Sequence, residues 1–278
     1  MSSGIRFDAN LSMLFTDLPL LARPAAAADA GYRAVELWWP FDVPVPVERE
    51  IESLRRALAD AGTQLVSLNL DGGDVSAGDR GLLSIPDKTP RVRANAEAAL
   101  AVAEATGCGI VNALYGNRVD AFSPGLQDET AMENLCWIAK AAEPAGVTVV
   151  VETLNSHDSP RFPLTDLDTT HSVVTEVRRR TGRENVGLLF DVYHLHRMGE
   201  DLVGAVRRAG ADIAHVQFAD APGRGRPGTG SIDFELVLTE LNAAGYAGHV
   251  GLEYIPAPGQ PDSLPPFLAV HHHPGGDQ

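Results

Sequence analysis

The sequence has few cysteines and no long apolar segment. Its 278 residues include only two cysteines, Cys108 and Cys136. No run approaches the roughly 20 apolar residues that a membrane-spanning helix needs, and residues 1–10 lack the apolar core of a secretory signal. We therefore expect a cytoplasmic protein with no membrane partner, in which both cysteines are reduced and buried as small hydrophobic side chains.

Positive charge is also scarce. The chain has 22 Lys and Arg against 37 Asp and Glu, which gives a formal net charge of -15 at pH 7. Binding to nucleic acid or to an anionic membrane depends on clustered Lys and Arg, so this balance disfavours both partners. It does not exclude a small anionic ligand. We expect a small-molecule substrate and no nucleic acid.

The fingerprint of a dinucleotide-binding fold is missing as well. The first predicted strand is followed by SMLFTD rather than by a glycine-rich turn. The glycine-rich stretch GRGRPGTG follows the seventh predicted strand and does not open a helix in the required way. We therefore predict no nucleotide cofactor.

Short apolar runs alternate with segments of helical periodicity along nearly the whole chain. Eight such units in about 250 residues indicate an α/β fold of one domain, a closed (β/α)8 TIM barrel over residues 1–278. We expect the tail, about residues 260–278, to be partly disordered, and His271–His273 within it to form no metal site. The predicted strands lie near residues 5–13, 34–40, 65–71, 110–116, 148–155, 186–194, 213–220 and 249–255.

Four oxygen-bearing side chains stand at or just before the ends of predicted strands. The loops after the strands build the active site of such barrels, so these side chains should converge at one end. Carboxylate and amide oxygens suit a hard divalent cation such as Mg²⁺ or Mn²⁺. The alternative is that one or two of them only bond neighbouring loop backbone. The four are Glu152 in TVVVETLN, Asp191 in VGLLFDVYH, Gln217 in IAHVQFAD and Glu253 in HVGLEYI.

Two histidines accompany these residues. His194 comes three positions after Asp191 and fits substrate binding, support of a carboxylate or simple packing. His215 alternates with Gln217 on the seventh strand, so both side chains point the same way. Spacing alone leaves open which of His215 and Gln217 is the ligand and which is its neighbour.

The predicted loops supply further candidates. Arg224 and Arg226 suit an exposed loop, but one of them could hold a substrate carboxylate because the loop follows the strand of Gln217. The longest irregular segment, residues 71–91, is predicted to be a functional loop. Other residues expected at the same end of the barrel are Asn10, Ser12, Glu36, Trp39, Asn69, Asp71, Tyr115, Asn155 and Asp220.

Six segments carry a resemblance to a known family. In order they are ANLSMLFTDLPLLAR, GYRAVELWWPFD, NLDGGDVSAGDRGLLSIPD, FDVYH, HVQFADAPGRGRPGTGSIDF and GLEYIP. Each combines a strand end with an unusual loop sequence, and together they run from about Phe7 to Pro256. The chain resembles the hydroxypyruvate isomerase family, within the xylose isomerase-like TIM barrels.

The resemblance implies an aldose-ketose type isomerase, active in carbohydrate and glyoxylate metabolism. It implies interconversion of hydroxypyruvate and 2-hydroxy-3-oxopropanoate (tartronate semialdehyde) through an enediolate that a divalent cation stabilises. Glu152 and Glu253 are implied as proton donor and acceptor, and a homo-oligomer is compatible with the family. The implied cation ligands are Glu152, Asp191, Gln217 and Glu253.

Related ketose epimerases extend the resemblance to substrate binding. Their pattern implies substrate contacts by His194 and Arg224. His215 and Asn69 are added as candidate substrate-binding residues because both should lie at the same end of the barrel.

The chain departs from the family pattern at three positions. Thr153 replaces a proline, His157 an arginine and Ile255 a lysine. The two lost positive charges keep open a 2-oxo-tetronate isomerase or a ketose 3-epimerase on the same barrel. Two other classes fit less well. A metal-dependent nuclease would need more histidine ligands and a basic face, and a non-catalytic sugar-acid-binding protein would not need two acid-base carboxylates.

Overall fold

The computed structural model describes residues 4–260 and 262–269. Eight strands pair in parallel, each with the next and the last with the first, and close into a barrel. The predicted (β/α)8 fold is therefore confirmed. The strands are β1 (Arg6–Asn10), β2 (Ala34–Leu37), β3 (Gln64–Asn69), β4 (Ile110–Asn112), β5 (Thr148–Glu152), β6 (Val186–Asp191), β7 (Ile213–Phe218) and β8 (His249–Leu252).

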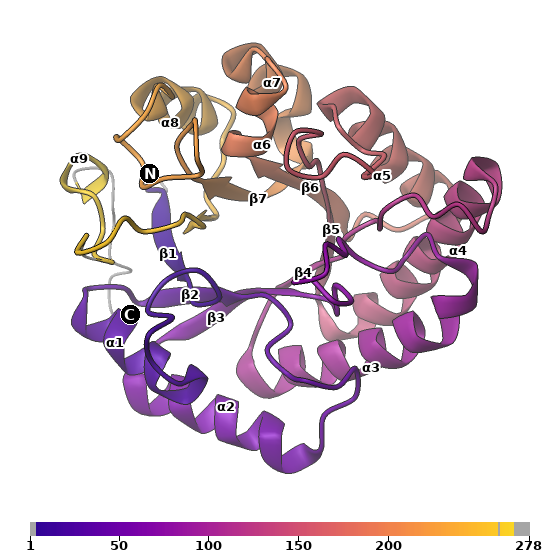
Figure 1. Cartoon of the computed structure of the whole chain (residues 1–278), viewed down its shortest axis with the longest axis horizontal. Helices are drawn as coiled ribbons and strands as arrows, with labels where there is room; N and C mark the ends of the chain where they lie inside the picture. The colour runs from indigo at the N-terminus through magenta and orange to yellow at the C-terminus, as the bar shows by residue number, and fades with distance from the viewer. Residues whose placement is uncertain (1–3, 261, 270–278) are drawn as a thin grey trace.

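Helices form a ring around this barrel (Figure 1). Residues 261 and 270–278, which include His271–His273 and about half of the tail predicted to be partly disordered, lie outside the described residues. Short 3-10 helices stand at Leu20–Ala22, Pro86–Lys88, Glu143–Ala145 and Gly210–Asp212. The α-helices are α1 (Arg23–Asp29), α2 (Glu48–Ala61), α3 (Thr89–Thr106), α4 (Pro124–Ala142), α5 (Leu167–Thr181), α6 (Val192–Arg197), α7 (Leu202–Ala209), α8 (Phe234–Ala243) and α9 (Pro266–Ala269).

Alternation along the strands separates an apolar layer from a polar barrel interior. On β1, Phe7 and Ala9 belong to the hydrophobic core, whereas Asp8 and Asn10 are buried polar residues. Successive side chains of a strand point to opposite faces, so the apolar set packs under the helices and the polar set fills the barrel. Burial of the apolar layer stabilises the barrel, and the interior is left for polar chemistry.

Some predicted strands are longer than the observed ones. The run near residues 186–194 ends as a strand at Asp191, because α6 begins immediately after it. The Asp191 carboxylate accepts a hydrogen bond from the His194 backbone N–H at 3.0 Å. An N-cap oxygen of this kind satisfies a free N–H group of the first helical turn and so starts the helix. His194 therefore lies on a helix one turn beyond Asp191, and the predicted strand end is wrong.

Two other expectations concern the cysteines and membranes. Cys108 is buried, as predicted, but Cys136 is only half-buried, and both are free thiols. Within residues 4–260 and 262–269, no helix combines the length and apolar character needed to cross a membrane.

Candidate active site

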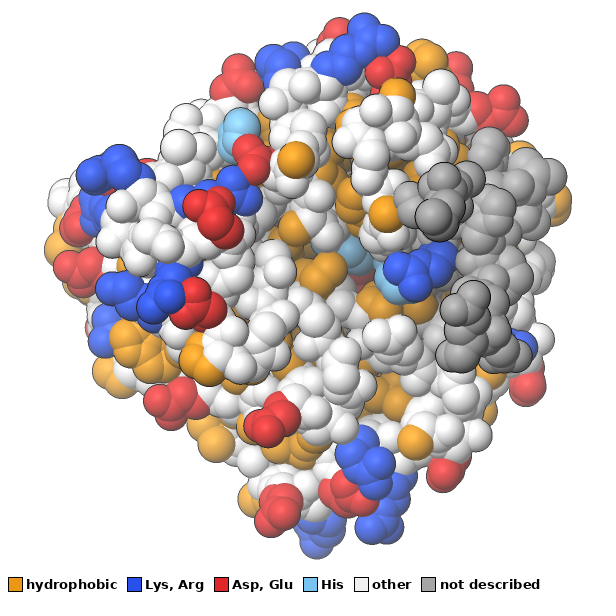
Figure 2. Space-filling view, turned by 180° about the vertical axis from the view of Figure 1, so that it is seen from behind, with side chains coloured by type: hydrophobic (Ala, Val, Ile, Leu, Met, Phe, Trp, Pro, Cys, Tyr) orange, Lys and Arg blue, Asp and Glu red, His pale blue; other side chains and the backbone are white. Residues whose placement is uncertain are grey.

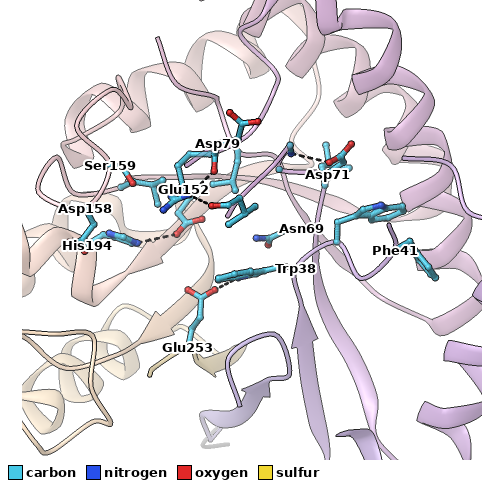
Figure 3. A pocket seen from close by; sticks show the side chains of 18 of the residues that line it. Trp38, Phe41, Asn69, Asp71, Asp79, Glu152, Asp158, Ser159, His194 and Glu253 are labelled. Atoms are coloured by element: carbon cyan, nitrogen blue, oxygen red, sulfur yellow. Dashed lines mark hydrogen bonds and ion pairs between the residues drawn. The ribbon is translucent and has the colours of Figure 1, made fainter. Parts of the chain in front are cut away.

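A cavity of about 420 Å³ lies at the carboxyl ends of the strands. Asn69 ends β3, Glu152 ends β5, and Glu253 directly follows β8. All three line the cavity, and His194 and Arg224 join them from α6 and from the loop between β7 and α8. Figure 3 shows Glu152, His194 and Glu253 pointing toward this space from different elements. The barrel therefore brings together residues that are far apart in the sequence.

Glu152, Asp191 and His194 form one close group of potential ligands. One ligand atom of each lies within 4.8 Å of the other two, and all three residues are buried. Asn112 on β4 holds Glu152 by donating from Nδ2 to Oε2 at 2.7 Å. Burial raises the pKa of Glu152 well above its ordinary value, and the charges of Glu253 and Asp191 raise it further. Burial also raises the pKa of Asp191 to about 6, against the opposing charge of Arg224.

His194 is a hydrogen-bond donor in this group. Its Nδ1 accepts from the backbone N–H of Asn155 at 3.1 Å and lies 2.7 Å from the Asn155 side-chain nitrogen. A backbone N–H can only donate, so a neutral His194 carries its proton on Nε2. That nitrogen lies 3.7 Å from Asp191 Oδ2 and 4.0 Å from Glu152 Oε1. Burial, then the positive charges of Arg224 and Arg80, lower the pKa of His194 well below its ordinary value. The ring therefore offers a neutral N–H donor to an oxygen in the cavity.

Glu253 is held by three donors. Trp38 Nε1 and Asn10 Nδ2 both donate to Oε1, the latter at 3.0 Å, and Arg224 pairs with Oε2. Burial raises the pKa of Glu253 to about 7, although Arg224 opposes the shift. Trp38 and Asn10 therefore fix the orientation of this carboxyl group in the cavity.

The loop between β7 and α8 positions Arg224. Asp220, at the start of this loop, accepts hydrogen bonds from the backbone N–H groups of Ala221, Gly228, Gly230 and Ile232 at 2.8 to 3.1 Å. Arg224 reaches the cavity, whereas Arg226 donates to the backbone oxygen of Ser263. Of the two arginines considered from the sequence, Arg224 is the one at the site.

A hydrogen-bonded cluster beneath the cavity centres on Glu36. Gln217 Nε2 and Asn10 Nδ2 each donate to Glu36 Oε1 at 2.8 Å, and His215 Nε2 lies 2.7 Å from Oε2. The Oε1 atom of Gln217 is buried and has no hydrogen-bond partner among the described residues. The Nδ1 atom of His215 is likewise buried and without a hydrogen-bond partner among the described residues. Neither of the two side chains lines the cavity. Of the two, Gln217 offers an unpaired oxygen, which is the ligand atom that a hard cation prefers.

Asp8, Glu36 and His215 form a second group of close titratable residues. Burial, then the charge of Glu36, raises the pKa of Asp8 well above its ordinary value. None of these three residues lines the cavity, and both oxygens of Glu36 already face side-chain partners. This group is a packed polar layer of the barrel.

The oxygen donors near the cavity fit a divalent cation. Asp191 and Gln217 are register partners on β6 and β7, and Gln217 presents an unpaired oxygen. A carboxylate oxygen of Glu152 and one of Asp191 lie within 4.8 Å of each other, so both could bind one Mg²⁺ or Mn²⁺ ion. A cation would also relieve the repulsion that raises the pKa of these carboxyl groups.

The three departures from the family pattern lie outside the cavity lining. Thr153 bonds through its hydroxyl to the Thr170 hydroxyl at 2.8 Å. His157 and Ile255 are exposed. None of them supplies a charge to the cavity.

The stability of the metal-free protein should fall as the pH rises. The folded protein holds the pKa of Asp191 at about 6 and that of Glu253 at about 7, above the ordinary values of about 4. It therefore binds more protons than the unfolded chain in this range, and the stabilisation present at low pH is lost as the pH rises through these values. We expect chelator-treated protein to have a lower Tm at about pH 8 than at about pH 6, and Mn²⁺ to raise Tm more at the higher pH.

Calorimetry at the two pH values measures this trend. The variant Glu253→Gln provides the control, because it lacks one of the two protonation steps and should show a smaller Tm difference. A Tm that rises from about pH 6 to about pH 8 in the chelated wild-type protein would contradict the electrostatic account of the site.

Known proteins resemble this chain over most of its length. A sequence model of the xylose isomerase-like TIM barrel family matches residues 24–269. A protein of Streptomyces coelicolor named "Putative hydroxypyruvate isomerase" is 50% identical over 253 residues, which cover 90% of this chain and 91% of that protein. A 2-oxo-tetronate isomerase of Pectobacterium atrosepticum is 30% identical over 270 residues, which cover 96% of this chain and 99% of that protein.

A solved structure shows the same architecture. The crystal structure of a Brucella melitensis protein described as an AP endonuclease, family 2, superposes with a TM-score of 0.87 at 31% identity. The match covers 97% of this chain and 100% of that one.

Proposed function

This chain belongs to the xylose isomerase-like TIM barrel family and is an isomerase, and we propose that it interconverts hydroxypyruvate and 2-hydroxy-3-oxopropanoate. The observation that carries the proposal is that Glu152 and Glu253 line one cavity from β5 and from the end of β8, beside a set of hard oxygen donors. Two carboxyl groups can share the transfer of a proton between neighbouring carbons, one as acceptor and the other as donor.

The reaction moves one proton from C3 of hydroxypyruvate and returns one to C2. Loss of the C3 proton leaves an enediolate with its negative charge on the C2 oxygen. The proton of the C3 hydroxyl then passes to the C2 oxygen, and protonation of C2 leaves C3 as the aldehyde carbon. One of Glu152 and Glu253 takes the proton and the other returns it. The raised pKa of both groups makes them better proton acceptors than an exposed glutamate. His194 donates from Nε2 to an oxygen on which charge develops.

A divalent cation, Mg²⁺ or Mn²⁺, held by Glu152, Asp191, Gln217 and Glu253, would polarise the C2 carbonyl and offset the negative charge of the enediolate. The protein residues then have separate tasks. Asn112 fixes Glu152, Trp38 and Asn10 fix Glu253, and Arg224 balances the charge of Glu253.

Exchange of the C3 protons in D₂O tests the proposal directly. With added Mg²⁺ or Mn²⁺, NMR should show deuterium entering C3 of hydroxypyruvate, because each return of the enediolate takes a proton from solvent. Exchange reports the first proton transfer even where net isomerisation is slow. Absence of exchange with both cations would remove the isomerase proposal for this substrate.

A 2-oxo-tetronate is the second candidate substrate. A relative with this activity in its name covers 96% of the chain, and a cavity of about 420 Å³ holds more than a three-carbon acid. Comparison of kcat/KM for hydroxypyruvate, a 2-oxo-tetronate and a neutral ketose distinguishes three activities: a hydroxypyruvate isomerase, a 2-oxo-tetronate isomerase and a ketose 3-epimerase.

We further propose a small molecule, not nucleic acid, as the substrate. On the face shown in Figure 2, Lys and Arg side chains are interspersed with Asp and Glu around the rim. The arrangement offers the backbone of a nucleic acid no continuous basic surface on that face. The net charge of -15 has the same consequence for long-range attraction.

A further inference from the structure

Three arginines line the cavity, and two of them are already paired with carboxylates. Arg91 Nε lies 2.7 Å from Asp71 Oδ2. Arg224 pairs with Glu253, and its Nη2 lies 3.7 Å from Asp191 Oδ2. Arg80 forms no ion pair with any carboxylate of residues 4–260 and 262–269. It is therefore the cavity arginine whose charge is left for a ligand.

Most of the Arg80 guanidinium is also free to donate. Nη1 donates to the backbone oxygen of Asp79 at 2.7 Å and to that of Val75 at 3.2 Å. These two carbonyl groups hold one edge of the guanidinium without neutralising it. Nε and Nη2 make no hydrogen bond to the part of the chain that the structure describes. A carboxylate could accept from two such N–H groups at once.

The loop between β3 and α3 fixes the backbone on either side of Arg80. The Asp79 carboxylate accepts from the Asp74 N–H at 2.9 Å, and the Gly81 N–H donates to the Gly72 oxygen at 2.9 Å. Gly81 has a φ of 97°, and a Cβ there would overlap the carbonyl oxygen of Leu114. The loop therefore packs directly on the segment after β4, so Arg80 is held in place before a ligand binds.

The proposed substrate needs such a residue. In a 2-oxo-3-hydroxy acid, the oxygens on C2 and C3 face the groups that handle the charge of the enediolate. The carboxylate on C2 then requires its own positive partner. The charge of Arg224 is matched by Glu253. Arg80 lines the same cavity as Glu152 and His194, so its guanidinium is within reach of a ligand bound there.

We propose that Arg80 binds the substrate carboxylate and so selects 2-oxo acids over neutral ketoses at this site. This proposal rests on the proposed function. Arg80 would then determine which class of substrate the site accepts, and the sequence patterns alone did not identify it. The sequence left Arg224 and Arg226 as the two candidates for this contact. In the structure Arg224 is the counter-charge of Glu253, and Arg80 takes the role.

The variant Arg80→Gln tests the contact. Loss of a charge-assisted hydrogen-bonding pair should raise KM for hydroxypyruvate by about 10- to 100-fold. The carboxylate contact is equally strong in the ground and transition states, so kcat should change by less than about threefold. Calorimetric titration of the Mn²⁺-loaded protein with tartronate, an unreactive hydroxy-dicarboxylate, should show the same loss of affinity. Arg80→Lys should restore part of it, because lysine keeps the charge but not the paired N–H groups.

Arg179→Gln is the matched control, because Arg179 is an exposed arginine of α5 that pairs with Glu176 and does not line the cavity. It should change both constants by less than about threefold. The inference is overturned if Arg80→Gln binds tartronate and hydroxypyruvate like the wild type, or if Arg179→Gln loses as much affinity.

Failure of the proposed function would have a different signature. The wild-type protein would then exchange no C3 proton of hydroxypyruvate. An affinity for tartronate that falls in Arg80→Gln would still establish the carboxylate contact in that case.

Discussion

Replacing Glu253 by glutamine should lower kcat for hydroxypyruvate isomerisation by about 10²- to 10⁴-fold, and Glu152→Gln should have an effect of similar size. Glutamine has nearly the shape of glutamate, but its amide can neither take nor return a proton at carbon. The oxygen of Gln at position 253 could still accept from Trp38 and Asn10. The barrel should therefore keep its fold while turnover is lost.

Three measurements make this result interpretable. Circular dichroism reports the fold, Mn²⁺ titration followed by electron paramagnetic resonance reports whether the cation still binds, and NMR reports turnover. Glu235→Gln is the control, since Glu235 is exposed on α8 and is not among the residues that line the cavity. Near-normal turnover in either active-site variant would show that the residue is not an acid-base group.

The exchange experiment also assigns the two roles. If Glu152 removes the C3 proton, Glu253→Gln should still exchange C3 with D₂O but return no proton to C2, and Glu152→Gln should do neither. The opposite pattern would assign proton removal to Glu253. Loss of exchange in both variants, with the cation still bound, would indicate that the two carboxyl groups act together in the first step.

Strand periodicity explains why so much of the site was predictable. Each of Glu152, Asp191, Gln217 and Glu253 interrupts or ends an apolar run, and parallel strands bring such ends to one edge of the barrel. The structure places Glu152 and Glu253 in one cavity and Asp191 close to Glu152. The roles of these residues remain part of the proposed function.

Other features depended on contacts between distant segments. Glu36 was predicted to lie at the correct end of the barrel, but its bonds to residues of β1 and β7 follow from barrel closure. Arg80 stands in an irregular loop, where no periodicity marks a functional side chain. The orientation of the His194 ring depends on Asn155, which lies 39 positions away. A local sequence pattern cannot predict the bonds of Glu36, the position of Arg80 in the cavity or the orientation of the His194 ring.

Replacing Glu36 by methionine should reduce the affinity for Mn²⁺ by about 10- to 100-fold, as expected for a residue that orients a ligand. Glu36 Oε1 accepts a hydrogen bond from Gln217 Nε2. This bond orients the Gln217 amide so that its Oε1 atom points away from Glu36 and has no partner among the described residues. The same oxygen accepts from Asn10, which also bonds Glu253. Methionine fills the space but removes the acceptor, so the Gln217 amide loses its fixed orientation and a buried N–H₂ group loses its partner.

Glu36→Gln is the matched control for that change. Gln217 and Asn10 both donate to a single oxygen of Glu36, and His215 faces the other. A glutamine at position 36 can keep an oxygen toward the first two, and His215 can accept from its amide by changing tautomer. Its affinity for Mn²⁺ should stay within about threefold of the wild type. An equal loss in Glu36→Met and Glu36→Gln would show that charge, and not orientation of the Gln217 amide, is what Glu36 provides.

Gly251 on β8 gives an independent route to the same contact. A Cβ at this position would lie 2.5 Å from Glu36 Oε2 and 2.7 Å from Oε1. Gly251→Ala should therefore displace the Glu36 carboxylate from its three partners, reduce the affinity for Mn²⁺ at least about tenfold and destabilise the fold by about 1 to 3 kcal/mol. The double variant Gly251→Ala, Glu36→Met tests whether both changes act through Glu36. In that case its affinity for Mn²⁺ should be little lower than that of the weaker-binding single variant, because the alanine methyl no longer meets a carboxylate. Additive losses would mean that Gly251 and Glu36 affect the cation by separate routes.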